Sequence, residues 1–376
     1  MWERDTLFRE ISDSNIIPPK LGGLEQLAEF KLEHISQDMK RDTSTNLWVP
    51  DGIEKPLQTL NPGFVDANDD LKLGQLDNDL KELLKSKPEF NKFFVNKSGN
   101  PAKGDKFHIA LIDLTDKKLL NPELAGWGST VAEEGGSVAK VAILYATFQL
   151  LNDLKSMKGH KTLTGVMNTA KKAAQNAKFS DPPKFHKFLD LRNKASKIEF
   201  SSFVQTAVNE FISHESNQHA RYLIHTVGFS YIGSLMLKSG LYHPKRGGIW
   251  LIGSYSKPKI TWSKPFWPVP KPLFRHNVTA LSLATFFALL AQRRLVTPDS
   301  SDKIKKSLST ASYFLPILPH AKIASKVGLV GNLVHEAGLI ENGRFRYAVA
   351  ILTNNAFSVL EPLIAEVDQL IQKNNP

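Results

Sequence analysis

The positions of the strand-forming segments along the chain constrain the fold most strongly. Residues 107–114 (FHIALIDL) have the apolar, β-branched character of a strand, and residues 123–127 follow after a short turn. Residues 333–340 and 347–353 lie near the C-terminus, where Glu341-Asn342-Gly343 joins them as a hairpin signal. With helices between these pairs, the pattern predicts an α+β domain whose first and last strands share one antiparallel sheet.

The segments between the strands, and the C-terminal end, predict helices. Apolar spacing and capping signals, such as Thr279 as an N-cap, support this interpretation. We therefore expect helices that flank the sheet and a helical lobe over about residues 155–300. The predicted helices cover residues 137–153, 160–230, 279–294 and 358–373.

Polar composition sets the first part of the chain apart. Residues 1–102 are rich in Pro, Asp, Asn and Lys, and only residues 71–84 show a helical spacing of leucines. Residues 98–105 (SGNPAKGD) are a loop signal. We predict a polar, partly helical N-terminal extension over residues 1–102 and a main domain over residues 103–376.

Composition excludes several classes of chemistry and partner. The 376 residues contain no cysteine, so disulfides and thiolate sites are excluded. The net charge of +11 is spread along the chain and matches no nucleic-acid module, so no nucleic-acid partner is expected. No nucleotide motif and no H-E-x-x-H occur, and we expect neither a cofactor nor a metal.

The N-terminus and the hydropathy give an expectation about location. The first residues, MWERDTLFRE, are charged and lack the apolar region of a secretory signal, and no apolar run is long enough to span a membrane. As written, the chain is expected to be cytoplasmic, and periplasmic or secreted if a leader was removed.

A possible nucleophile and base lie one helical turn apart. Ser137-Val138-Ala139-Lys140 follows a Gly-Gly pair and opens an apolar helix. Residues at i and i+3 share a helix face, so the lysine lies beside the serine. A serine hydroxyl needs a base to accept its proton, and a lysine whose pKa is lowered can serve as that base. A helix N-terminus also directs N–H groups at a developing oxyanion.

Three segments occur in an order known from one family. They are residues 135–144 (GGSVAKVAIL), 211–228 (FISHESNQHARYLIHTVG) and 324–340 (ASKVGLVGNLVHEAGLI), with residues 346–354 following. Together they resemble the class A β-lactamase and penicillin-binding protein superfamily, whose motifs are S-x-x-K, S-D-N and K-T-G. The resemblance covers about residues 103–376 and implies a β-lactamase/transpeptidase-like fold there.

The resemblance also implies roles for the motif residues. Ser137 would form the acyl-enzyme, Lys140 would activate it, and Asn217 would hydrogen-bond the substrate and Lys140. Lys326 would line the site from an edge strand and supply positive charge.

Backbone groups and the residues after Lys326 complete the implied site. Val327 and Gly328 would contact the substrate, and the backbone N–H groups of Ser137 and Leu329 would form the oxyanion hole.

The second and third motifs depart from the family pattern. Glu215 stands where the family has a serine, and it would pair with Lys140 or Lys326, act as a general acid or base, or serve only as a structural ion-pair partner. A register in which Ser216 leads is the alternative. Val327 replaces a threonine, which removes a hydroxyl that the family uses to bind a substrate carboxylate.

The acyl-enzyme would also need a route to deacylation. From residue 217 to 298 the chain contains no Asp and no Glu, so the glutamate that class A β-lactamases use after the second motif is missing. Hydrolysis would have to use Lys140, Glu215 or a residue from elsewhere such as Glu336, or the acyl group would pass to another nucleophile.

Aromatic residues gather in residues 240–278, a segment rich in Pro and Gly. Trp250, Trp262, Trp267, Tyr242 and Tyr255 would either line an apolar substrate pocket or pack within an irregular insertion.

The sequence thus favours a serine hydrolase that cleaves an amide or ester bond of a small molecule or peptide through an acyl-enzyme. One alternative is a D,D-peptidase or penicillin-binding protein. The other is a non-catalytic member of the fold that binds a ligand or partner. The acyl donor, the acceptor and the oligomeric state are not encoded in these motifs.

Overall fold

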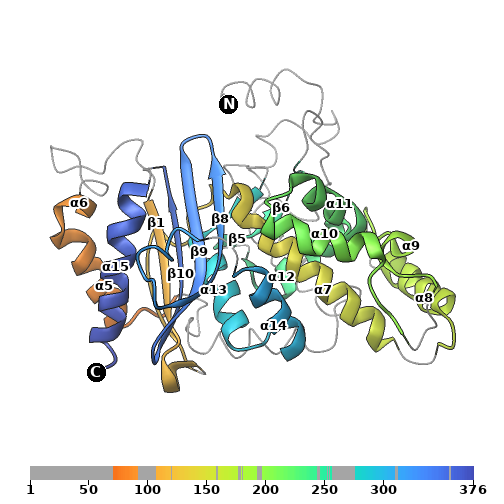
Figure 1. Ribbon diagram of the computed structural model, residues 1–376, viewed down its shortest axis with the longest axis horizontal. Coiled ribbons are helices and arrows are strands. Elements are labelled where there is room, and N and C mark those ends of the chain that lie inside the picture. The colour runs from red at the N-terminus through yellow and green to blue at the C-terminus, as the bar shows by residue number, and fades with distance from the viewer. Residues whose placement is uncertain are drawn as a thin grey trace.

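A computed structural model describes the chain from residue 71 onward, with gaps (Figure 1). The described residues are 71–91, 107–119, 121–157, 160–176, 179, 181–192, 197–243, 246–251, 253, 255, 276–309, 312–354 and 357–376. Of the extension predicted over residues 1–102, residues 1–70 and 92–102 lie outside the described residues, as do Trp262 and Trp267.

A five-stranded antiparallel sheet forms the centre of the fold. Its strand order is β2-β1-β10-β9-β8, so the first described strand pairs with the last. This confirms the prediction that N-terminal and C-terminal strands share one sheet. The β9–β10 hairpin turns at Gly343, as predicted. The strands are β1 (Phe107–Asp113), β2 (Glu123–Trp127), β8 (Lys322–Val330), β9 (Leu333–Asn342) and β10 (Phe345–Thr353).

Helices cover both faces of this sheet (Figure 1). On one face lie α5 (Gln75–Ser86), α6 (Pro88–Asn91) and α15 (Phe357–Lys373), packed on the odd-numbered side chains of β1 and β10. On the other face α13 (Ala280–Ala291) packs on the even-numbered side chains of the same strands. Because strand side chains alternate, each face contributes to a separate apolar core.

Capping explains where α13 begins. The Thr279 side chain accepts a hydrogen bond from Ser282 N, and the Ser282 side chain accepts one from Thr279 N. This capping box confirms Thr279 as the predicted N-cap. All residues of α13 except Ala291 are buried, as expected for a helix that is apolar all round.

A helical lobe extends from the α13 face of the sheet (Figure 1). The predicted helical stretch over residues 160–230 is interrupted by loops and by an isolated bridge between Leu189 and Phe200. The lobe and its neighbours comprise α7 (Lys140–Ser156), α8 (Leu163–Asn176), α9 (Phe185–Phe188), α10 (Ser202–Ser213), α11 (Asn217–Val227), α12 (Phe229–Lys238) and α14 (Pro298–Ser307).

Short strands support the entry to α7. β3 (Glu133–Glu134) pairs with β7 (His276–Val278), which pairs with β6 (Trp250–Leu251). A separate pair joins β4 (Tyr242–His243) to β5 (Gly247–Gly248). None of the described helices combines the length and apolar character needed to cross a bilayer.

The predicted domain boundary at residue 102 stays a prediction. The structure adds that α5 and α6 belong to the packing of the sheet, since Leu76, Leu80, Leu84 and Phe90 are buried against β1, β10 and α15. The leucine spacing that predicted a helix in residues 71–84 therefore reflects an apolar stripe directed at this sheet.

Candidate active site

Ser137 lies in a tight turn at the entry to α7. Gly136–Ala139 form a 3₁₀ turn, η3, and the α-helix proper begins at Lys140. Gly136 has a φ of +50°, and a Cβ there would collide with the Val330 side chain of β8, so the turn requires glycine. The predicted helix start is thus a 3₁₀ turn, and Ser137 is half-buried within it.

The edge strand β8 approaches this turn closely. A Cβ on Gly328 would lie 2.5 Å from the Gly135 carbonyl oxygen and 2.9 Å from the Val138 nitrogen. Only glycine permits such an approach of two backbones. Gly328, predicted to contact substrate, therefore also fixes the distance between β8 and η3.

One backbone N–H group at this junction, that of Leu329 in β8, faces the open edge of the sheet. Ser325 N donates to Leu308 O at 2.9 Å, outside the sheet, and residues two apart on a strand direct their N–H groups to the same side. The Leu329 N–H is therefore directed away from the edge of the sheet. The Leu329 carbonyl oxygen lies 3.4 Å from the place that a Cβ on Gly136 would take. Within the described chain, the Ser137 N–H has no hydrogen bond.

Glu215 joins the two lysines that the sequence predicted for the site. Lys140 Nζ donates to the Glu215 carbonyl oxygen at 3.0 Å and lies 3.6 Å from Glu215 Oε2. Lys326 Nζ pairs with Glu215 Oε1 and donates to the Val327 carbonyl oxygen at 2.9 Å. Both lysine side chains are buried, whereas the Glu215 side chain is 47% exposed.

Burial makes Lys140 a candidate base. Loss of solvation lowers the pKa of Lys140 to about 8, while Glu215 raises this pKa and Lys326 lowers it. Burial likewise lowers the pKa of Lys326, against the opposing effect of Glu215. With a pKa of about 8, roughly a tenth of Lys140 is neutral at pH 7 and able to accept a proton.

Asn217 does not make the contact predicted for it. It is exposed in the first turn of α11, whose N-cap is Ser216, and it has no hydrogen bond to Lys140. The reason is the left-handed conformation of Glu215, with φ 53°, which directs the carbonyl and carboxylate of that residue to the lysines. A contact between Asn217 and substrate stays a prediction.

Glu336 lies on the other face of the sheet from Lys326. Its carboxylate accepts hydrogen bonds from the hydroxyls of Ser312 and Ser325 and from Tyr313 N, at 2.6, 2.7 and 3.0 Å. Burial raises the pKa of Glu336 to about 7. In the register of β8 and β9, Glu336 lies opposite Val327, so the two side chains share one face of the sheet. The structure therefore does not bring the Glu336 carboxylate to Lys140.

Tyr255 is a site residue that the sequence motifs did not identify. Its hydroxyl donates to the Gly136 carbonyl oxygen at 2.8 Å, directly before Ser137. The Lys140 ammonium lies 5.3 Å from the centre of its ring, within the range of a cation–π interaction. Tyr255 thus contacts both the turn that carries Ser137 and the base.

A histidine and a glutamate hold Tyr255 in place. The His276 ring stacks on Tyr255 with centroids 4.1 Å apart, and His276 Nδ1 lies 3.3 Å from Glu134 Oε1. His335 Nε2 contacts the Glu134 carbonyl oxygen at 3.1 Å. The sequence marked Tyr255 only as one of several aromatic residues, and no motif predicted the pairing of β3 with β7 that brings His276 to Glu134.

Within the described residues, no group of three or more His, Asp or Glu side chains is arranged to hold a metal ion. The arrangement offers instead a hydroxyl, a buried amine of lowered pKa and two N–H groups at the same junction of η3 and β8. These groups are the ones that acyl transfer to a serine needs.

Comparison with solved structures finds similar chains at low sequence identity. One is a structure of PBP-A, 15% identical, with 80% of this chain and 96% of that chain covered and a TM-score of 0.46. Another is a beta-lactamase from Chitinophaga pinensis DSM 2588, 14% identical, with 81% and 100% covered and a TM-score of 0.47. TLA-3 extended-spectrum beta-lactamase is 14% identical, with 80% and 98% covered and a TM-score of 0.47.

Assignment to a family rests on the sequence. None of the curated proteins compared with this chain matches it. The family model described as the beta-lactamase enzyme family matches residues 91–373, well over half of the 376 residues. The match includes η3, β8 and Glu215, which build the junction described above, and the fold is beta-lactamase-like. The chain therefore belongs to the beta-lactamase enzyme family.

Proposed function

We propose that this protein is a serine hydrolase that cleaves an amide or ester bond through an acyl-enzyme on Ser137. The observation that carries the proposal is the buried Lys140, whose pKa is lowered to about 8 and which lies one turn after Ser137. Membership of the family supports a hydrolase of this superfamily.

The first half of the reaction uses groups at the junction of η3 and β8. Neutral Lys140 accepts the Ser137 hydroxyl proton as Oγ attacks the carbonyl carbon of the substrate. The N–H groups of Ser137 and Leu329 donate to the oxyanion that forms. When the tetrahedral intermediate collapses, the leaving nitrogen or oxygen takes up the proton that Lys140 received, and the acyl group remains on Ser137.

Glu215 is the group that connects Lys140 to the leaving group in this proposal. Its carboxylate contacts both lysines, and its side chain is 47% exposed, so it reaches solvent as well as the base. A carboxylate in this position passes the proton from Lys140 outward and, in the second half, accepts a proton from the water that hydrolyses the acyl-enzyme.

Two covalent probes test the proposal. The protein is treated separately with a fluorescent fluorophosphonate and a fluorescent penicillin, and the labelled peptide is identified by mass spectrometry, with Ser137→Ala as the control. We expect the phosphonate to label Ser137 in the unmodified protein and to leave the Ser137→Ala variant unlabelled at that peptide.

Other outcomes separate the alternatives. Efficient labelling of Ser137 by the penicillin would identify a penicillin-binding protein of the D,D-peptidase type. Absence of labelling by either probe in correctly folded protein contradicts catalysis and favours a binding role for the fold.

A further inference from the structure

The Lys326 ammonium is already bound by other groups of the protein. An ammonium has three N–H donors, and two of those of Lys326 are taken by Glu215 Oε1 and by the Val327 carbonyl oxygen. The lysine side chain is only 3% exposed. The positive charge at this position is therefore neutralised internally, by Glu215 in the turn between α10 and α11.

Glu215 is held firmly in this arrangement. A non-glycine residue at φ 53° is strained, and such conformations persist only where several contacts fix them. Here the Glu215 carbonyl oxygen accepts from Lys140, and its two carboxylate oxygens lie against the two lysines. An incoming anion would have to displace Glu215 from Lys326 or lie beside a carboxylate of the same charge.

The edge of β8 next to Lys326 offers no replacement for an anion-binding group. Val327 and Leu329 lie two residues apart and so share a face, and both are apolar. Leu329 is 56% exposed, and Val327 is half-buried. Both side chains lie on the face of β8 that carries Glu336, opposite Lys326, so neither supplies an anion-binding group beside the lysine.

A cationic substrate fits no better, because the two carboxylate oxygens of Glu215 already lie against Lys140 and Lys326.

From these contacts we propose that the Ser137 site takes uncharged acyl donors, and that Glu215 excludes donors with a carboxylate near the scissile bond. This inference rests on the proposed function, because it names the substrate class of the same site.

Matched thioester donors test the inference. One donor carries a thioglycolate leaving group and the other its uncharged thioglycolamide analogue, so the two differ only in a carboxylate on the leaving side. Released thiol is measured with a thiol reagent, to which the cysteine-free protein contributes no background. We expect kcat/KM for the uncharged donor to exceed that for the anionic donor by about tenfold or more, the size of one incompletely screened charge contact.

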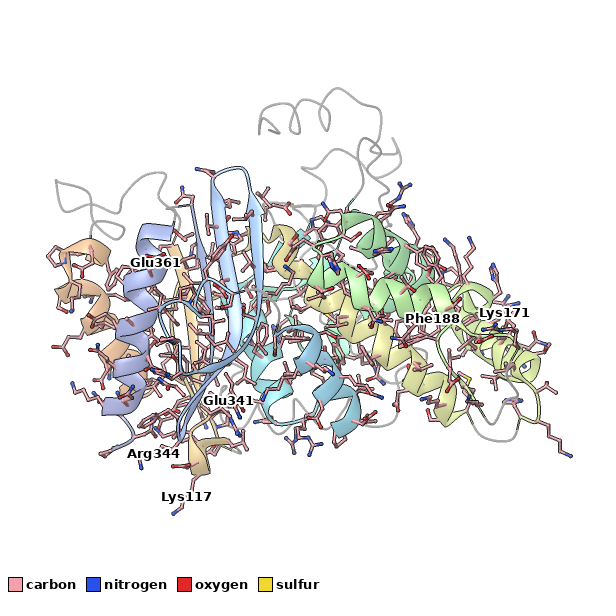
Figure 2. All side chains as sticks on the ribbon, viewed as in Figure 1. Lys117, Lys171, Phe188, Glu341, Arg344 and Glu361 are labelled. Atoms are coloured by element: carbon pink, nitrogen blue, oxygen red, sulfur yellow. The ribbon has the colours of Figure 1, made fainter. Side chains whose placement is uncertain are left out.

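Two glutamine variants test whether Glu215 is the residue that slows turnover of the anionic donor. Glu215→Gln removes the charge and should reduce the ratio of the two kcat/KM values to about 1 or below. The control is Glu361→Gln on α15, an exposed glutamate that Figure 2 shows on the side of the sheet away from the helical lobe, and it should keep the ratio of the unmodified protein.

Raising the ionic strength should also shrink the ratio of the two kcat/KM values, because Glu215 is 47% exposed and salt screens its charge. The salt measurement needs no variant, so it tests the inference even if Glu215→Gln does not fold.

Distinct results overturn the two proposals. Turnover that depends on Ser137 but is as fast for the anionic donor, or a ratio unchanged in folded Glu215→Gln, overturns the inference and leaves the hydrolase proposal standing. Equal turnover of the uncharged donor by the unmodified protein and by Ser137→Ala overturns the proposed function, and the inference with it.

Discussion

Tyr255 and Glu215 hold the two reacting groups of the site in different ways. The Tyr255 hydroxyl fixes the Gly136 carbonyl, and so the turn that carries Ser137, while its ring faces the Lys140 ammonium. Glu215 accepts from Lys140 through its backbone and pairs with it through its side chain. The geometry of nucleophile and base therefore depends on two residues outside the S-x-x-K sequence.

Substitutions of Tyr255 should separate its two contacts. Tyr255→Phe removes the hydrogen bond to Gly136 but keeps the ring, so we expect acylation of Ser137 to slow by about tenfold at an unchanged apparent pKa. Tyr255→Leu also removes the cation–π contact that favours protonated Lys140, so the apparent pKa of acylation should fall by about half a unit to one unit. The measurement is the rate of phosphonate labelling as a function of pH.

Tyr242→Phe is the matched control for the loss of a buried tyrosine hydroxyl. Tyr242 packs against Trp250, at centroids 4.8 Å apart, and has no contact to Lys140 or Gly136. Its substitution should leave the labelling rate and the pH profile unchanged. An equal slowing in Tyr242→Phe and Tyr255→Phe would mean that Tyr255 acts only through general stability.

At the scale of elements, the contact between β8 and η3 determines the geometry of the site. β8 is an edge strand, so the N–H of Leu329 is free to face a substrate, and Gly328 lets the strand reach Gly135 and Val138. The site is therefore formed by the edge of the sheet and the entry to α7, not by either element alone.

Gly328→Ala should disrupt this contact. The added Cβ would lie 2.5 Å from the Gly135 carbonyl oxygen, so β8 and η3 must separate. A displacement of about 1 Å at a catalytic group costs on the order of 100-fold in rate, and we expect a loss of this size in Ser137 labelling. Gly74→Ala is the control, because no atom lies within 4 Å of its added Cβ and its φ is −114°. Labelling of Gly328→Ala at the unmodified rate would contradict this role.

The same elements show how far the sequence could predict the molecule. Apolar, β-branched residues predicted β1, the hairpin signal at residues 341–343 marked the join of β9 and β10, and capping chemistry predicted the start of α13, because these signals are local. The left-handed turn at Glu215 and the position of Tyr255 depend on contacts between segments far apart in the chain. The motif spacing therefore identified Ser137, Lys140 and Lys326 as candidates but could not show that Glu215, and not Asn217, contacts both lysines.

At the scale of the whole molecule, the sheet is covered by helices from both ends of the described chain. α5 and α15 lie together on the face opposite the helical lobe (Figure 1). Leu80 of α5 is fully buried in the apolar core that these helices form with the sheet. Residues before the predicted boundary at 102 thus contribute to the core beneath β1, the strand that begins the five-stranded sheet in the chain.

Leu80→Ala measures this contribution. Removing a fully buried leucine side chain destabilises a domain by about 2–5 kcal/mol, and we expect a decrease of that size in the free energy of unfolding measured with denaturant. Leu73→Ala is the control, since Leu73 is 45% exposed and its loss should change the free energy by about 0.5 kcal/mol or less. A change below 1 kcal/mol at Leu80 would show that α5 is not part of the cooperative core.

The claim that Ser137 is a nucleophile activated by Lys140 is tested most directly by the pH dependence of fluorophosphonate labelling at Ser137. Because only neutral Lys140 accepts a proton, the labelling rate should rise about tenfold per pH unit below the pKa of Lys140 and level off above about pH 8. A rate that does not change between pH 6 and pH 9, about two units below and one unit above the pKa of Lys140, would contradict the account.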